Sequence, residues 1–292
     1  MARRTSKLTH PEQAMNPTAL PLCCAPEAFN LLARQVPAIE SPDALVHGAA
    51  AIAMHQMEGV ELAAVDATLQ GYVDTVRSRV RGSQPQAVLA HLHDVLFDEE
   101  QFTGNQEDYY NTSNSYLPEV LRTKRGLPIS LSLIYKVVAE RLGLRAWGIG
   151  LPGHFLCGVD VDGKIMLVDA YCGGRVVTVD EAHARMQEML GPDVEWSDEL
   201  LQPVSNKHWL TRMLQNLLHT FGNSGHFADV AAVLELEMIL WPDREQLQRD
   251  LALVLARCGL SEPASIWLDR YLKNNPDDPQ KSELAQLLDV LK

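Results

Sequence analysis

The strongest constraint on the fold of this chain is the segment LPGHFLCGVDVDGKIMLVDAY, residues 151–171. Residues 154–161 are largely apolar and have a high preference for strands, and residues 164–169 have the same character. The Asp162-Gly163 dipeptide between them is typical of a two-residue turn that joins antiparallel strands. The segment therefore predicts a β-hairpin in which the numbers of paired residues add up to 325, because 162 and 163 form the turn.

This register places a histidine beside an aspartate. Asp169 lies opposite Leu156, and Leu156 shares a face with His154 because side chains alternate along a strand. His154 and Asp169 are then diagonal neighbours, ~7–8 Å apart at the backbone, a gap that a carboxylate can bridge to an imidazole. Such a pair is typical of a general base and the group that orients it. The alternative is a His and an Asp that share a face by chance, and a bulge in the turn would remove the shared face.

The segment before the hairpin predicts a buried helix. Pro128 is a favoured first helical residue, and Gly143 is a natural stop after Leu142. Residues 129–139 are almost wholly apolar, and the exceptions are Ser130, Ser132 and Lys136. A helix of this composition is buried on most of its sides.

The order of buried helix, strand with His and strand with Asp resembles the core of the transglutaminase-like family, which is related in architecture to papain-type thiol enzymes. AERLGLRAW matches the end of that family's helix, and His154 and Asp169 match its His and Asp. The longer string NSYLPEVLRTKRGLPISLSLIY, followed by LPGHFL and VDAYCGG, is similar to the bacterial SirB1 subfamily. The resemblance implies an α+β fold: a transglutaminase-like (papain-like) core with a buried central helix and an antiparallel sheet, an N-terminal helical region, and C-terminal tetratricopeptide-like repeats.

The resemblance places the family's nucleophilic cysteine at Pro128, which has no nucleophilic atom. Ser130 is the nearest substitute, as a vestigial or alternative nucleophile, but two residues along a helix turn the side chain by about 200°. A serine also needs a base in hydrogen-bond contact, so a capping or packing role is the alternative. Cys157 and Cys172 each lie three residues beyond His154 and Asp169, which predicts buried thiols on the opposite face.

Two further residues are candidates for ligand binding. Asn114 and Tyr116 lie in the stretch that resembles the SirB1 approach to the core helix, and we expect them to line the pocket near His154 or else to serve as a helix cap and a packing anchor. His91 and His93 are two residues apart on a predicted helix, so they cannot chelate together. We therefore expect no metal and no cofactor.

Composition narrows the classes of partner. A net charge of −13 argues against nucleic acid and against anionic membrane surfaces, and no apolar segment reaches membrane-spanning length. The five cysteines lack metal-binding spacing, and Cys23-Cys24 are adjacent, which fits a reducing cytoplasm.

The C-terminal third contains a repeat. The residue pairs 34 positions apart are Gly225 and Gly259, Pro242 and Pro276, Leu217 and Leu251, and Leu234 and Leu268. A period of this length is typical of tetratricopeptide helix pairs, and it predicts helices over 206–222, 226–241, 244–257 and 262–274, with a last helix over 281–291. The alternative is a helical bundle in which the period is coincidental. Stacked helix pairs bind a peptide or pack on a neighbouring domain.

These patterns divide the chain into an N-terminal helical region (1–104), a transglutaminase-like core (105–200) and tetratricopeptide-like repeats (205–292). The absence of a thiol at Pro128 favours a non-catalytic protein that binds or regulates a protein or peptide partner through the repeats. The alternative is an amidohydrolase or acyl-transferase that uses His154 and Asp169 with Ser130 or a water as the nucleophile.

Overall fold

Helices form the N-terminal part of the chain in the computed structural model, which describes residues 20–82 and 84–292. They are α1 (Pro26–Gln35), α2 (Pro42–Met54), α3 (Leu62–Arg79) and α4 (Pro85–His93), and a π-helical segment, η2 (Asp94–Glu99), continues α4. Proline stands at the start of α1, α2 and α4, where its missing N–H costs no hydrogen bond. The helical pattern of this region is as the sequence predicted.

The central helix is α6 (Pro128–Arg141), which follows the short α5 (Leu117–Thr123). Every residue from 128 to 139 is buried, so the apolar run does predict a helix that is enclosed by its neighbours. Gly143 ends the helix with a φ of +89°, a backbone conformation that glycine adopts without a steric penalty.

Five antiparallel strands pack against α6. They are β3 (Arg145–Ile149), β4 (Leu156–Val161), β5 (Lys164–Asp169), β6 (Arg175–Val177) and β7 (Pro203–Val204), in the spatial order β6-β5-β4-β3-β7. Cys157 pairs with Val168 and Val161 pairs with Lys164, which is the register that the two-residue turn predicted. The first strand of the hairpin begins at Leu156 rather than at residue 154, because His154 N–H closes a turn onto the carbonyl oxygen of Leu151. A separate pair of two-residue strands, β1 (Thr103–Gly104) and β2 (Arg125–Gly126), runs parallel.

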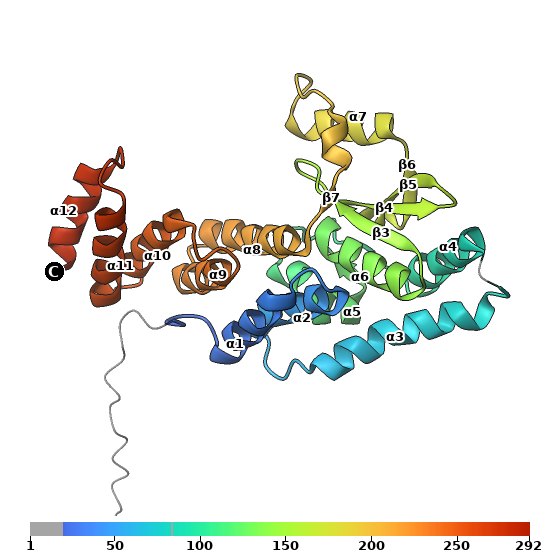
Figure 1. Cartoon of the computed structure of the whole chain (residues 1–292), viewed down its shortest axis with the longest axis horizontal. Helices are drawn as coiled ribbons and strands as arrows, with labels where there is room; N and C mark the ends of the chain where they lie inside the picture. The colour runs from blue at the N-terminus through green and yellow to red at the C-terminus, as the bar shows by residue number, and fades with distance from the viewer. Residues whose placement is uncertain (1–19, 83) are drawn as a thin grey trace, which may run out of the picture.

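Helices lie on both faces of the large sheet (Figure 1). On the α6 side, Cys157, Val159 and Val168 belong to the main core. On the other side, Leu156 and Leu167 pack beneath α7 (Val179–Leu190), whose start is fixed by a capping box between Thr178 and Glu181, and the segment after α7 leads into the 3-10 turn η5 (Asp198–Leu201). The end of the sheet near Leu156 and Asp169 therefore lies between two helical layers.

The C-terminal helices are α8 (Asn206–Asn223), α9 (Phe227–Leu240), α10 (Glu245–Arg257), α11 (Ser261–Asn274) and α12 (Lys281–Leu291), close to the predicted bounds. The turn between α8 and α9 and the turn between α10 and α11 are 34 residues apart and have the same form: Gly225 has a φ of +71° and Gly259 a φ of +78°. The hydrogen bond from His226 N–H to the Phe221 carbonyl recurs from Leu260 N–H to the Leu255 carbonyl, each at 3.0 Å. The four leucines of the repeat are all buried, namely Leu217, Leu234, Leu251 and Leu268.

The helix pair α8–α9 packs on the rest of the chain as well as on α10. Trp209 of α8 is fully buried, its ring lies 4.5 Å from that of Phe155, and its Nε1–H donates to the carbonyl oxygen of Ile129. Glu235 of α9 accepts hydrogen bonds from the backbone N–H groups of residues 22–24, which precede α1. The predicted division at residue 205 is thus crossed by buried contacts, and the boundary stays a prediction.

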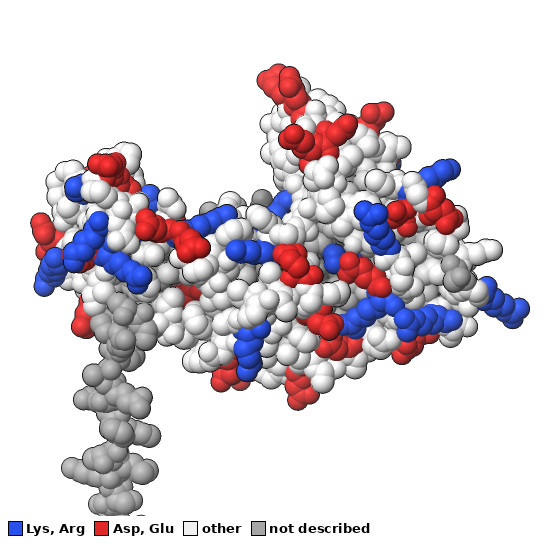
Figure 2. Space-filling model, viewed as in Figure 1, with Lys and Arg blue, Asp and Glu red and all other residues white. Residues whose placement is uncertain are grey.

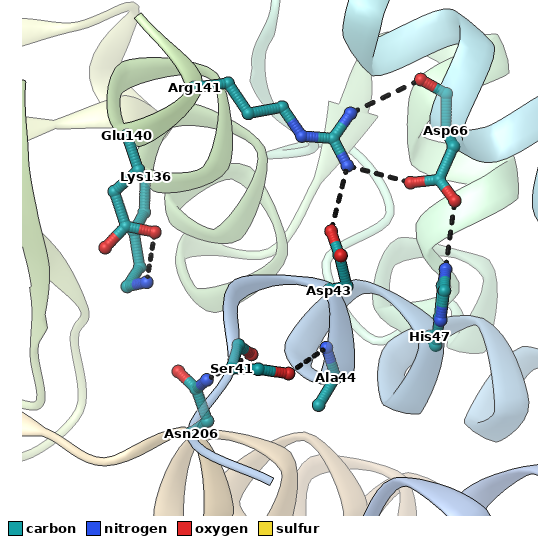
Figure 3. Close-up of polar contacts among 9 residues, drawn as sticks. All are labelled: Ser41, Asp43, Ala44, His47, Asp66, Lys136, Glu140, Arg141 and Asn206. Carbon is teal, nitrogen blue, oxygen red and sulfur yellow. Dashed lines mark hydrogen bonds and ion pairs between the residues drawn. The ribbon is translucent and has the colours of Figure 1, made fainter. Parts of the chain in front are cut away.

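Ionic contacts join the helices α2, α3 and α6 (Figure 3). Arg141, at the end of α6, lies 2.8 Å from a carboxylate oxygen of Asp66 on α3, and Asp66 in turn lies 2.9 Å from Nε2 of His47 on α2. Asn206 at the start of α8 donates to the carbonyl oxygens of Ile39 and Ser41. These contacts fix α2 and α3 relative to the buried helix α6, and they fix the start of α8 against the segment that leads into α2.

On the face shown in Figure 2, basic and acidic side chains are interspersed, and acidic ones gather at the tip formed by α7 and the loop after it. Among residues 20–82 and 84–292, no helix combines the length and apolarity needed to cross a membrane.

Candidate functional site

His154 and Asp169 form a buried pair at the end of the sheet. The Nε2 atom of His154 lies 2.9 Å from Oδ2 of Asp169, and only 5% and 3% of the two side chains are exposed. The other carboxylate oxygen accepts the backbone N–H of Cys172 at 3.1 Å, and the ring of Tyr171 stands edge-on to the imidazole. The contact expected from the hairpin register is therefore present.

The charges in this pair follow from its surroundings. Burial alone would raise the pKa of Asp169, but the hydrogen bond and charge of His154, together with the N–H of Cys172, hold that pKa below its ordinary value of 3.8. An ionised carboxylate can only accept, so Nε2 of His154 carries the shared proton. Whenever the ring carries only this proton, its Nδ1 atom is left as the acceptor that a base requires.

The depressed pKa of Asp169 makes a prediction about pH. A carboxylate with a lowered pKa in the folded state stabilises the fold at every pH above its unfolded pKa, and this contribution is lost as the pH falls through the folded pKa. We expect the free energy of unfolding to fall more steeply between pH ~5 and pH ~3 in the wild type than in an Asp169→Asn variant. Urea unfolding at each pH measures both slopes, and equal slopes would show that the fold does not lower the pKa of Asp169.

A cavity of about 350 Å³ opens beside the imidazole. It is lined by Tyr109, Tyr110, Pro128, Ile129, Gly153, His154, Phe155, Met189, Arg212 and Asn216. Pro128 is the first residue of α6, so the helix start and His154 border the same space. Pro128, which stands where the resemblance places the nucleophile, and His154, the expected base, thus line the same cavity.

The serines of α6 do not fill the place of a nucleophile. Ser130 is fully buried, and its Oγ has no hydrogen-bond partner in the described chain, so it does not contact His154. Ser132 is also fully buried and donates weakly to the carbonyl oxygen of Phe155 at 3.5 Å. Neither serine is among the residues that line the cavity, as the rotation along the helix from Pro128 leads one to expect.

The two cysteines of the hairpin region differ from each other. The thiol of Cys157 is fully buried, as predicted. Its Sγ donates to the carbonyl oxygen of Ser132, and burial raises the pKa of the thiol to about 12. Cys172 is only half-buried and borders a second cavity of about 260 Å³ together with His154 and Asp169. The face argument is wrong for Cys172 because the strand ends at Asp169 and a 3-10 turn, η4 (Ala170–Cys172), follows. Burial and the nearby carboxylate raise the pKa of its thiol.

Asn114 and Tyr116 lie behind the cavity wall instead of in it. Both are buried, and Asn114 donates to the carbonyl oxygens of Asp108 and Tyr109. Asn114 therefore holds the loop that presents the two tyrosines Tyr109 and Tyr110. Sequence reasoning missed these tyrosines and Arg212, and no local pattern links Arg212 on α8 to a histidine 58 residues earlier.

Within the described ranges, no group of three or more His, Cys, Asp or Glu side chains is arranged to hold a metal ion. The two histidines of α4 are used separately: Nε2 of His93 lies 2.9 Å from the hydroxyl of Tyr135, and His91 pairs with Asp94.

Comparison with known proteins places this site in a family. The Transglutaminase-like superfamily model matches residues 63–215, a range that includes α6, the hairpin and Arg212. A UPF0162 protein of Xylella fastidiosa (strain 9a5c) is 32% identical over 236 residues, which cover 80% of this chain and 84% of that protein. F-box only protein 21 of Mus musculus is 33% identical over 171 residues, which cover 55% of this chain and 26% of that protein. No solved structure matches the chain. The chain therefore belongs to the transglutaminase-like superfamily and, within it, to the UPF0162 proteins.

Proposed function

We propose that this chain is a non-catalytic transglutaminase-like protein that binds or regulates a protein partner. The observation that carries the proposal is the proline at the start of α6, which borders the cavity beside the intact pair of His154 and Asp169. A thiolate at a helix start is stabilised by the helix dipole, whereas a proline ring has no nucleophilic atom. Ser130 and Cys157 are both fully buried, and the pKa of the half-buried Cys172 thiol is raised, which supports the reading that no other side chain has taken over as nucleophile.

The partner is a protein or peptide that binds the helix pairs α8–α9 and α10–α11. Their turns and cap geometries recur at an offset of 34 residues, which supports a tetratricopeptide-like stack, and such stacks bind peptides. The assignment to the SirB1 subfamily, whose members carry such helices, is part of the same proposal. All five cysteines lie in the described part of the chain and are unpaired, which suits a cytoplasmic location.

Restoring a thiol tests the catalytic half of the proposal. In a Pro128→Cys, Cys172→Ser variant, we expect the new thiol to have a lowered pKa, because it stands at a helix start beside His154. Its alkylation by iodoacetamide at pH ~6 should be about 100-fold faster than that of an ordinary exposed thiol. Mass spectrometry of the labelled protein measures the rate.

The matched control is Tyr110→Cys, also made with Cys172→Ser, because residue 110 lines the same cavity, is 67% exposed and lies outside the helix. Equal rates for the two thiols would contradict an activating arrangement at residue 128. A wild-type chain that hydrolyses amide or ester substrates, and loses this activity in His154→Gln, would overturn the non-catalytic assignment.

A second candidate function is supported by the pair itself. With Asp169 orienting it, His154 could take a proton from a water in the cavity, which would make the chain a hydrolase without a covalent intermediate. Turnover that depends on both His154 and Asp169, and that is insensitive to iodoacetamide, is the result expected of this alternative.

A further inference from the structure

Arg212 is a half-buried cation without an acidic partner. It projects from α8, and its Nη2 donates to the carbonyl oxygens of Leu151 at 2.9 Å and His154 at 3.3 Å. No carboxylate in the described chain lies within ion-pair distance of the guanidinium. Burial lowers the pKa of Arg212 below its ordinary value, but an arginine remains charged at neutral pH.

The guanidinium is held in place while part of it stays available. Its carbon lies 5.1 Å from the centre of the Phe155 ring, and the two carbonyl bonds fix its plane. Nε and Nη1 donate to no described residue, and neither of these atoms is sealed from solvent. Gly150 permits this position, because a β-carbon there would collide with Nη1.

The cavity that Arg212 borders is lined by hydrogen-bond donors and by no aspartate or glutamate. Asn216 follows Arg212 by one helical turn, so the two side chains lie on one face of α8, and the Asn216 amide makes no hydrogen bond within the described chain. The hydroxyl groups of Tyr109 and Tyr110 are likewise free of hydrogen bonds to described residues. Asp169, the acid nearest to His154, borders the other cavity and is already paired.

We propose that this cavity binds a carboxylate of a peptide, with Arg212 and Asn216 as the groups that recognise it. A carboxylate oxygen can accept a charge-assisted hydrogen bond from Nε or Nη1, the guanidinium donors that are left free, and a buried cation gains more from an anionic ligand than an exposed one does. Pro128, Ile129 and Phe155 form an apolar wall that suits the adjoining side chain of the peptide. The carboxylate is the chain terminus or an acidic side chain, and the probes below separate these two sources.

The proposal goes beyond the proposed function, which places the partner on the helix pairs, because it names a ligand class for the cavity beside His154. The probes are N-acetyl-phenylalanine and its amide for a terminal carboxylate, acetyl-Phe-Glu-amide and acetyl-Phe-Gln-amide for a side-chain carboxylate, and phenyl phosphate. Each is titrated into the ¹⁵N-labelled full chain, and the Nε resonance of Arg212 is followed by NMR. We expect a saturable shift with one or both carboxylates, with a Kd of about 1 mM or tighter, and none with the amides.

Three variants locate the binding. Arg212→Lys keeps the charge but loses the planar guanidinium that the two carbonyl bonds position, and it should weaken carboxylate binding by about tenfold, equal to about 1.4 kcal/mol. Asn216→Leu should also weaken carboxylate binding. Residue 216 is exposed, so this change should leave the stability of the fold nearly unaltered. Gly150→Ala should weaken binding by displacing the guanidinium without removing charge. Arg145→Gln is the control, because its side chain is 78% exposed and lies at the far end of β3.

Equal binding of carboxylates and amides would overturn the proposal, as would tighter binding of phenyl phosphate, the absence of any saturable shift, or an equal loss in Arg145→Gln. These outcomes are distinct from failure of the proposed function, which depends on turnover and on thiol reactivity at residue 128. A chain that hydrolyses substrates could still bind carboxylates through Arg212, and a non-catalytic chain could fail to bind them.

Discussion

Deletion of residues 242–292 is expected to leave a folded chain, whereas deletion of residues 205–292 is expected to abolish cooperative unfolding. The helices α10–α12 contact the rest of the chain chiefly through α9, so their loss uncovers one helical layer. The longer deletion also removes Trp209 from the core and Glu235 from its three backbone donors. Loss of a buried tryptophan alone costs about 3–5 kcal/mol, a large part of the stability of a typical domain.

Circular dichroism and urea unfolding of the two truncated chains check this result. Trp209→Ala and Trp267→Ala in the full chain are a matched pair, because both rings are buried but only Trp209 lies against the sheet. We expect Trp209→Ala to lower the stability of the whole chain and Trp267→Ala to loosen only the C-terminal helices. A folded, cooperative fragment of residues 1–204 would favour the boundary at residue 205 instead.

Replacement of His154 by leucine is expected to destabilise the chain by about 3–5 kcal/mol, because it leaves a buried carboxylate without its partner. Asp169 is only 3% exposed, so bulk water solvates its carboxylate poorly. The double variant His154→Leu, Asp169→Leu should lose much less, since no carboxylate then remains in the interior. Chemical unfolding of the wild type and the three variants gives the coupling free energy of the pair.

The control for this cycle is the surface pair of His91 and Asp94, whose side chains are 36% and 51% exposed. Its disruption by His91→Leu should change the stability by no more than about 1 kcal/mol, because exposed ion pairs contribute little. If His154→Leu cost no more than His91→Leu, the carboxylate of Asp169 would not depend on His154, and the assignment of His154 as an oriented base would fail.

The sequence by itself determined the local geometry of the site. The Asp162-Gly163 turn and the alternation of side chains set the register that joins His154 to Asp169, because both act within one hairpin. Pro128 and Gly143 likewise set the limits of α6, since the start and the stop of a helix depend on the residues at its ends.

Only the tertiary structure decided what surrounds that pair. Arg212 reaches the cavity because α8 packs on α2 and α6, and this placement depends on contacts such as that between Trp209 and Phe155. Cys172 borders the second cavity because the chain leaves the strand after Asp169, where alternation stops giving the direction of a side chain. Patterns along a sequence report which face of an element is apolar, but the partner of that face is fixed by packing between segments that are distant in the chain.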